Sequence, residues 1–179
     1  MKTGQVSLQE INAFDQEHFI DALGSLFEGP PWIVMQAWYA RPFYSRTQLY
    51  QVLCEIMHHA PVEQQVALLQ AHPDLVGRAA QAGTLTPESS REQAAAGLNR
   101  LTPEEITTFN RLNQAYWSRF GFPFVICARE NKKDSILAGF STRLEYSRSQ
   151  EIAIALSEVA TICSFRLNDL IVPGEIEES

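Results

Sequence analysis

Apolar residues recur at helical spacing along most of this chain, and the recurring segments are bounded by helix start and stop signals. The clearest amphipathic segment begins at Ser45 and places five apolar side chains on one stripe: Leu49, Val52, Leu53, Ile56 and Met57. The strongest start signal begins at Thr102, a capping residue that is followed by a proline at the first helical position and a glutamate at the third. This pattern predicts an all-α protein.

Further signals divide the rest of the chain. Helix starts lie at Ser7, Asp15, Pro61 and, overlapping, around Thr86; an apolar segment covers residues 32–39, and two last helices cover roughly 134–146 and 149–171, ended by Pro173. Residues 122–128 form a β-leaning run without a second strand to pair with, so we expect a buried extended segment there. The fold expected is a single-domain helical bundle of about eight helices over residues 1–179, with an ordered core at about 7–172.

Composition excludes several classes of protein. Of the 179 residues, 45% are apolar and 20% are charged, which argues against a disordered tail or a rod. Fourteen Lys and Arg against 21 Asp and Glu give a formal charge of −7. This balance argues against a nucleic-acid or anionic-membrane surface, but it leaves a small anionic ligand open.

Cysteine usage and the chain ends indicate a compartment. Cys54, Cys127 and Cys163 form no C-x-x-C pair and are expected to be free thiols in a reducing environment, with Cys127 buried and unreactive. The first residues lack the apolar core of a signal peptide, and no apolar stretch approaches the roughly 18 residues of a membrane span. The last residues are not a peroxisomal signal. We therefore expect a cytoplasmic protein.

The first candidate for chemistry is His72, which is followed by Pro73 and Asp74. Because a proline forces the preceding residue out of helical geometry, the imidazole is expected at a helix end, aimed into a turn, where it suits general acid–base catalysis. The alternative is a capping or surface histidine, with Asp74 as the cap of the next helix. The tripeptide also occurs in co-chaperone J-domains, but there the preceding helix is basic, whereas residues 61–71 contain no Lys or Arg.

The second candidate combines Ser89, Glu92 and Gln93. A serine followed three residues later by a glutamate is the capping-box pattern, so one interpretation is purely structural. In the other, the carboxylate and the amide lie in the first turn of a helix, and Glu92 accepts hydrogen bonds from a polar substrate or orients His72.

The third candidate is the extended segment itself. A stretched backbone in apolar surroundings leaves N–H and C=O groups without ladder partners, and a ligand rich in amides could satisfy them. The alternative is a packed strap of the core.

The fourth candidate is Arg166, which shares a largely apolar helix face with Ile162. An arginine in such a place requires a carboxylate partner, which could be Glu92, Glu158 or an acid group of a substrate. The alternatives are an intramolecular ion pair or a snorkelling surface side chain.

A metal site is weakly indicated by Glu55, His58 and His59. Adjacent histidines diverge by about 100° on a helix, and no third ligand is in register. A solvated helix end is the expected structure.

Taken together, these motifs resemble one family, the 2-oxo-4-hydroxy-4-carboxy-5-ureidoimidazoline (OHCU) decarboxylases of purine catabolism. The matching stretches, in order, are H-P-D-L from His72, S-x-x-E-Q-x-x-x-G-L from Ser89, F-N-x-L-N-x-x-Y from Phe109, F-G-F-P-F-V-I-C from Phe120 and E-x-x-x-I-x-x-x-R from Glu158. The similarity runs from near residue 8 to residue 171. Each motif is weak alone, but their order and spacing are specific.

The resemblance implies an all-helical homodimer that needs no metal or organic cofactor and converts OHCU into (S)-allantoin and carbon dioxide. It implies a catalytic pair, His72 and Glu92. The substrate-binding positions that it implies are Pro73, Ser89, Gln93, Phe124, Val125, Ile126, Cys127 and Arg166. The expected partners are a ureide substrate and a second copy of the chain, with no nucleic acid and no membrane. The competing class is a non-enzymatic helical interaction module.

Overall fold

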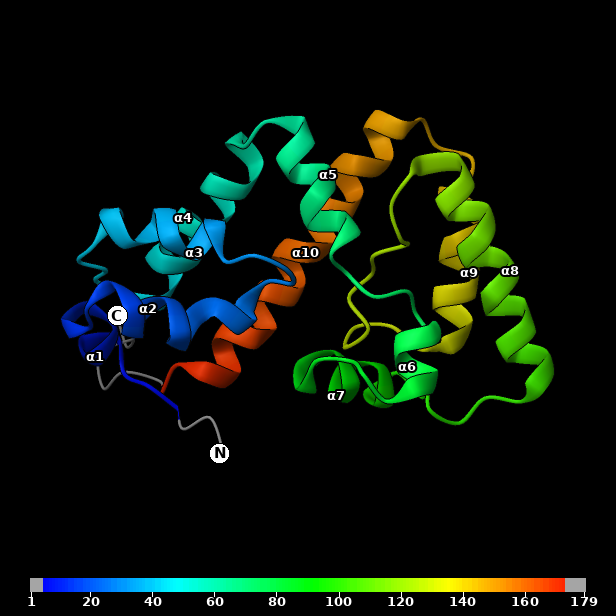
Figure 1. Ribbon diagram of the computed structural model, residues 1–179, viewed down its shortest axis with the longest axis horizontal. Coiled ribbons are helices and arrows are strands. Elements are labelled where there is room, and N and C mark those ends of the chain that lie inside the picture. The colour runs from blue at the N-terminus through cyan, green and yellow to red at the C-terminus, as the bar shows by residue number, and fades with distance from the viewer. Residues whose placement is uncertain (1–4, 173–179) are drawn as a thin grey trace. The chain divides into compact units, whose positions relative to one another are not determined.

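The prediction of an all-α fold is confirmed by a computed structural model, which describes residues 5–172 (Figure 1). Within this range there is no strand; a single parallel bridge joins Val6 to Ile171. None of the helices in this range is long and apolar enough to cross a membrane. The helices are α1 (Leu8–Ala13), α2 (Gln16–Leu23), α3 (Trp32–Ala37), α4 (Arg46–His59), α5 (Val62–Gln70), α6 (Arg78–Ala82), α7 (Pro87–Ala95), α8 (Pro103–Phe120), α9 (Lys133–Arg143) and α10 (Arg148–Leu170), with 3-10 turns at Gly24–Leu26 and Trp38–Ala40.

Most helix starts that the sequence predicts are confirmed by side-chain caps. Ser7, Asp15, Ser45 and Thr102 each accept a hydrogen bond from the backbone N–H three residues later. Ser7 and Thr102 form full capping boxes, because the glutamate three residues on returns a bond to the cap's own N–H. The last helix ends at Leu170; Pro173, its predicted stop, lies outside the described residues.

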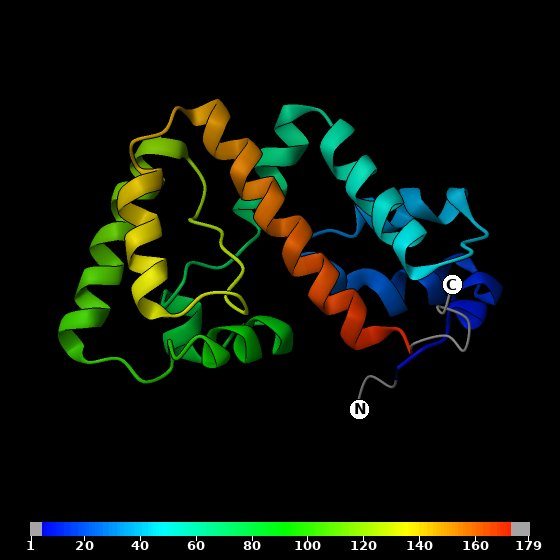
Figure 2. The ribbon, with the colours of Figure 1, turned by 180° about the vertical axis from the view of Figure 1, so that it is seen from behind.

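The contacts of the chain divide it into two compact units, so its organisation as one domain stays a prediction. Unit 1 takes the chain up to Pro61 together with the chain from Ala160 onward, and unit 2 is Val62–Val159. Helix α10 therefore contributes its second half to unit 1 and its first half to unit 2 (Figure 2).

Unit 1 is closed by the two ends of the described chain. Val6 donates its N–H to Leu170 at 2.9 Å and accepts from Val172 at 3.0 Å, so the segment before α1 is tied to the end of α10. Its core includes Phe19, whose ring lies 6.3 Å from that of Phe43. Asn12 holds the Phe43 backbone through both N–H and C=O, at 2.8 and 2.7 Å.

Unit 2 is built around an aromatic cluster between α8 and α9, which lie side by side in both views (Figures 1 and 2). The buried Tyr116 ring from α8 meets Phe124 and Phe140 edge to face, and Phe124 stacks on Phe140 at 3.9 Å. Phe124 belongs to residues 122–128, which are buried except for the half-buried Ile126, and of which 123–127 run without helix, turn or bend. The predicted buried extended segment is confirmed, and the aromatic rings explain why it stays inside without a sheet.

Thr102 provides a test of the capping prediction. The substitution Thr102→Ala removes the acceptor of the Glu105 N–H, so the free energy of unfolding should fall by about 0.5–2 kcal/mol in urea titrations. Thr107→Ala is the matched control, because its exposed hydroxyl bonds only back to Pro103 within the same helix. That variant should stay within about 0.5 kcal/mol of the unsubstituted protein, and equal losses in both would contradict the prediction.

Candidate active site

His72 lies two residues after the end of α5, in unit 2, and is buried. Its backbone N–H donates to Leu69, and its Nδ1 lies 2.9 Å from the carbonyl oxygen of Leu68, one of the last carbonyls of the helix. Because a carbonyl can only accept, Nδ1 carries the hydrogen in this contact. Nε2 is therefore the nitrogen that can exchange a proton with a ligand. The predicted placement of the imidazole at a helix end is confirmed.

The turn that follows His72 is held by side chains from α7 and α8. Val76 has a φ of +56°, which is rare for a β-branched residue, and its N–H donates to Oε1 of Gln93 at 3.1 Å. The Leu75 carbonyl accepts from Asn113 Nδ2 at 2.8 Å. A backbone conformation of this kind persists only when its surroundings over-determine it, and such strain clusters at functional sites.

Asp74 does not cap the next helix, so that part of the alternative is wrong, although the contact of His72 with the Leu68 carbonyl is of the capping kind. The N-cap of α6 is Gly77, and Asp74 instead accepts the indole N–H of Trp117 at 2.7 Å. Gly77 donates its N–H to the Asp74 carbonyl, and a Cβ at this position would lie 2.6 Å from Asp74 Cβ. The turn is tight enough to require glycine, and it draws the Asp74 side chain back towards α8.

Helix α7 begins earlier than the Ser89–Glu92 capping box requires, so that interpretation is also wrong. Thr86 is the N-cap and accepts the Ser89 N–H, with Pro87 at the first helical position, where its missing N–H costs nothing. Glu92 consequently lies in the second turn of the helix, not in the first as predicted. Ser89 and Gln93 are buried and Glu92 is half-buried, and none of the three is the cap of the helix.

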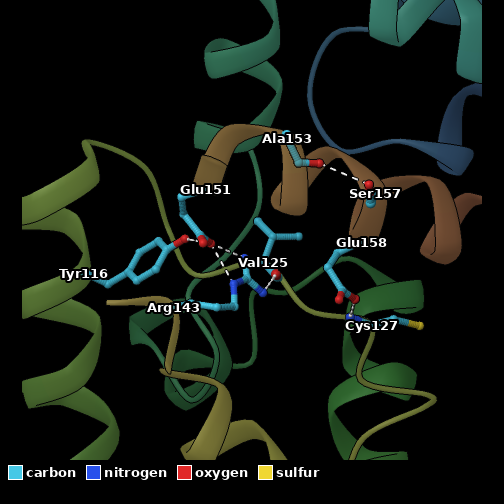
Figure 3. A network of polar contacts seen from close by, with 8 residues as sticks. All are labelled: Tyr116, Val125, Cys127, Arg143, Glu151, Ala153, Ser157 and Glu158. Carbon is cyan, nitrogen blue, oxygen red and sulfur yellow. Dashed lines mark hydrogen bonds and ion pairs between the residues drawn. The ribbon is translucent and has the colours of Figure 1, made fainter. Parts of the chain in front are cut away.

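The extended segment is held by two charged side chains. Arg143 from α9 donates from Nη1 to the Val125 carbonyl at 2.7 Å, and Glu158 from α10 accepts the Cys127 N–H at 2.8 Å (Figure 3). The prediction that the segment leaves amide groups unsatisfied is thus wrong for these two groups. Among the described residues, the Ile126 N–H donates to no acceptor and the Ile126 C=O accepts from no donor. Burial raises the pKa of the Cys127 thiol, as expected for an unreactive cysteine.

Arg166 is buried in unit 1, where it makes an intramolecular ion pair. Its Nη2 donates to Glu28 at 3.0 Å and its Nη1 donates to the Ser25 carbonyl at 3.0 Å. The alternative of an intramolecular ion pair is confirmed, with Glu28 as the carboxylate, whereas Glu158 accepts from the Cys127 N–H. A role of Arg166 towards a substrate stays a prediction.

A metal site at the end of α4 is not supported. His59 Nδ1 donates to the Glu55 carbonyl at 2.8 Å, which is the same contact that His72 makes one helix later. Among residues 5–172, no group of three or more His, Cys, Asp or Glu side chains is placed to hold a metal ion.

The structure also contains a cavity of about 310 Å³ that is lined in part by α7. Gln93 and Val76 line it together with residues of α6 and of the start of α8, but neither His72 nor Glu92 is among its lining residues. It is therefore not the pocket in which the sequence predicts these two side chains to meet. One link between the His72 turn and α7 is the Gln93–Val76 hydrogen bond.

Sequence reasoning missed three polar residues that shape this region: Asn113, Arg143 and Glu151. A signal was present for two of them, because each falls on an apolar helix stripe. Asn113 lies four residues after Phe109, and Arg143 lies three residues after Phe140. A polar side chain on a buried stripe needs a buried partner, which is what both have.

Comparisons with known proteins show to which family the chain is related. The family model of OHCU decarboxylases matches residues 12–168. A 2-oxo-4-hydroxy-4-carboxy-5-ureidoimidazoline decarboxylase of Halalkalicoccus jeotgali is 38% identical over 171 residues, 96% of this chain and 95% of that protein. One of Amia calva is 39% identical over 166 residues, 93% of this chain and 95% of that protein. The uric acid degradation bifunctional protein PucL of Bacillus subtilis is 36% identical and matches 92% of this chain, which spans 33% of PucL.

Solved structures of related proteins have the same fold. An (S)-allantoin synthase superposes with a TM-score of 0.74 at 25% identity, over 93% of this chain and 54% of that chain. An OHCU decarboxylase crystallised in the presence of (S)-allantoin superposes with a TM-score of 0.67 at 21% identity, and it supports the fold. Fold and comparisons together define an all-α carboxy-lyase. More particularly, the chain belongs to the OHCU decarboxylase family.

Asp74 gives the candidate site a pH-dependent signature. Burial raises its pKa, and the Trp117 N–H and the Arg78 charge offset this only in part. A carboxyl group whose pKa is raised on folding stabilises the fold below its unfolded pKa of about 3.9, and that contribution is lost as the pH rises through the folded pKa.

The substitution Asp74→Asn keeps an oxygen for the Trp117 N–H and stays neutral. It should therefore increase the free energy of unfolding at pH 7 and leave it unchanged near pH 3.5, as measured by urea denaturation at both pH values. A gain of equal size at both, or a loss at pH 7, would contradict the burial argument.

Proposed function

We propose that this protein converts OHCU into (S)-allantoin and carbon dioxide in urate degradation, with His72 and Glu92 as its catalytic pair. Membership of the OHCU decarboxylase family supports the reaction, and relatives that match nearly their whole length carry that name. The observation that carries the residue assignment is the buried His72, whose Nδ1 is committed to Leu68 so that Nε2 is the proton-transferring atom. The competing interaction module predicts no such oriented buried imidazole.

The reaction sets a specific task. Loss of carbon dioxide leaves an electron pair on carbon, and the neighbouring carbonyl of the substrate can accept it as an enolate. The protein must then fix the substrate, stabilise the developing negative charge and deliver one proton to one face. Hydrogen-bond donors aimed at such charge contribute roughly 3–4 kcal/mol each where their removal has been measured in other enzymes.

Gln93 suits the role of a donor. Its Oε1 accepts the Val76 N–H, so the amide group faces a ligand with its NH₂ end only. Ser89, one helical turn earlier, is buried on the same helix. In this proposal both side chains bind oxygen atoms of the substrate, and Pro73 contributes an apolar contact beside the imidazole.

The other assignments are proposals of the same kind. The backbone from Phe124 to Cys127 binds the amide groups of the substrate, with the Ile126 N–H and C=O as the groups available. Arg166 holds an anionic oxygen of the substrate. The active form is a homodimer in the cytoplasm, and it uses no metal or organic cofactor.

The role of His72 is tested with His72→Asn, which can still donate to the Leu68 carbonyl. Turnover of freshly generated OHCU should fall by about 10²- to 10⁴-fold, because general acid–base catalysis is lost. Circular dichroism of the product should show that the allantoin formed is no longer a single enantiomer. His59→Asn makes the same change at a histidine with the same local contact and should leave turnover unchanged. A folded His72→Asn protein with full rate and full stereospecificity would remove His72 from the mechanism.

Glu92 is tested with Glu92→Gln. Since Thr86 caps α7, this change removes no cap, and the free energy of unfolding should change by less than about 0.5 kcal/mol. Turnover should nevertheless collapse if the carboxylate orients the imidazole or grips the ureido N–H groups. Glu88→Gln is the matched control on the same helix, where the half-buried Glu88 pairs with the exposed Arg91. Equal activity in the two variants would contradict a catalytic Glu92.

A further inference from the structure

Ile126 sits between two peptide groups that are each held at one end. The peptide group before it is held by its carbonyl, that of Val125, which accepts from Arg143. The peptide group after it is held by its N–H, that of Cys127, which donates to Glu158. Figure 3 shows the two side chains reaching the segment from α9 and α10. The flanking contacts therefore fix the orientation of both peptide planes.

The geometry of an extended chain determines the side to which the Ile126 N–H and C=O point. In an extended segment the N–H and C=O of one residue point to the same side, and those of its neighbours point to the opposite side. Arg143 and Glu158 bind the side on which Val125 and Cys127 present their groups. Ile126 therefore presents a donor and an acceptor together on the other side, as one residue of a sheet edge does.

The Arg143 contact is rigid because the guanidinium is anchored twice more. Its Nε donates to Glu151 Oε1 at 2.7 Å, and Nη2 and the Tyr116 hydroxyl donate to the same oxygen. The guanidinium also lies 4.3 Å from the centre of the Phe124 ring. Glu151 is fully buried, so any movement of Arg143 would leave a buried carboxylate without its counter-charge.

We propose that Arg143 and Glu158 are positioning residues that take the place of a neighbouring strand and aim the Ile126 N–H and C=O at the substrate. A ring amide or ureido group presents an N–H beside a C=O, and the Ile126 pair is complementary to that edge. Ligands without adjacent amide N–H and C=O groups would lose this recognition. The inference rests on the proposed function, because that function brings a ureide to this segment.

The rival explanation is that the two side chains only satisfy buried backbone groups. Both explanations predict a loss of stability when Glu158 is removed. Only positioning predicts a change in the Michaelis constant that the conservative variant restores. Glu158→Gln keeps a carbonyl oxygen for the Cys127 N–H, whereas Glu158→Leu has a similar size and no acceptor. Ser157→Ala is the control one residue earlier, where the hydroxyl donates to Ala153 within α10 at 3.1 Å.

The experiment uses the full chain, with OHCU turnover for kinetics and (S)-allantoin as the ligand probe in ¹H–¹⁵N spectra. In Glu158→Leu the KM for OHCU should rise by about 3- to 10-fold, the range of one lost hydrogen bond, with a smaller change in kcat. Glu158→Gln and Ser157→Ala should keep the original KM. In the unsubstituted protein, saturating allantoin should shift the Ile126 amide proton downfield.

Two results would overturn the proposal: a folded Glu158→Leu protein with the original KM, or an Ile126 amide that allantoin leaves unchanged. The second measurement needs no variant, so it decides the matter even where Glu158→Leu fails to fold. A failure of the proposed function looks different, because the unsubstituted protein would then not turn over OHCU at all.

Discussion

Buried peptide groups outside helices must find hydrogen-bond partners, and in this protein side chains supply many of them. An all-α chain has no sheet to satisfy a backbone that leaves a helix inside the core. Asn12 therefore binds both polar groups of Phe43 in unit 1, and Arg143 and Glu158 bind Val125 and Cys127 in unit 2. The same requirement explains why polar side chains occupy apolar helix stripes.

This requirement also organises the candidate active site. The turn after α5 can keep a left-handed Val76 because Gln93 and Asn113 bind the peptide groups around it. The bond from Gln93 ties that turn, and with it His72, to the helix that carries Glu92. Fixed donors and acceptors suit a reaction in which the substrate supplies its own electron sink, since the protein then contributes mainly orientation and one directed proton.

Local sequence signals predict the structure correctly where the competing interactions are also local. The caps at Ser45 and Thr102 and the buried segment at residues 122–128 are as predicted. The errors concern residues with more than one available partner. Helix α7 is capped by Thr86, with Pro87 at its first position, and not by Ser89. Asp74 accepts a hydrogen bond from the Trp117 indole and does not cap α6.

The spacing of residues along the chain is sufficient to predict the helices, the buried segment at residues 122–128 and, through the order of the motifs, the family, because spacing reflects helical periodicity and turn chemistry directly. The pairing of the buried charges depends instead on the folded arrangement. Arg166 pairs with Glu28, 138 residues away, and Arg143 combines Glu151 with a backbone carbonyl. From the sequence alone, several carboxylates are equally possible partners for a buried charge. Folding then brings one of them within hydrogen-bond distance.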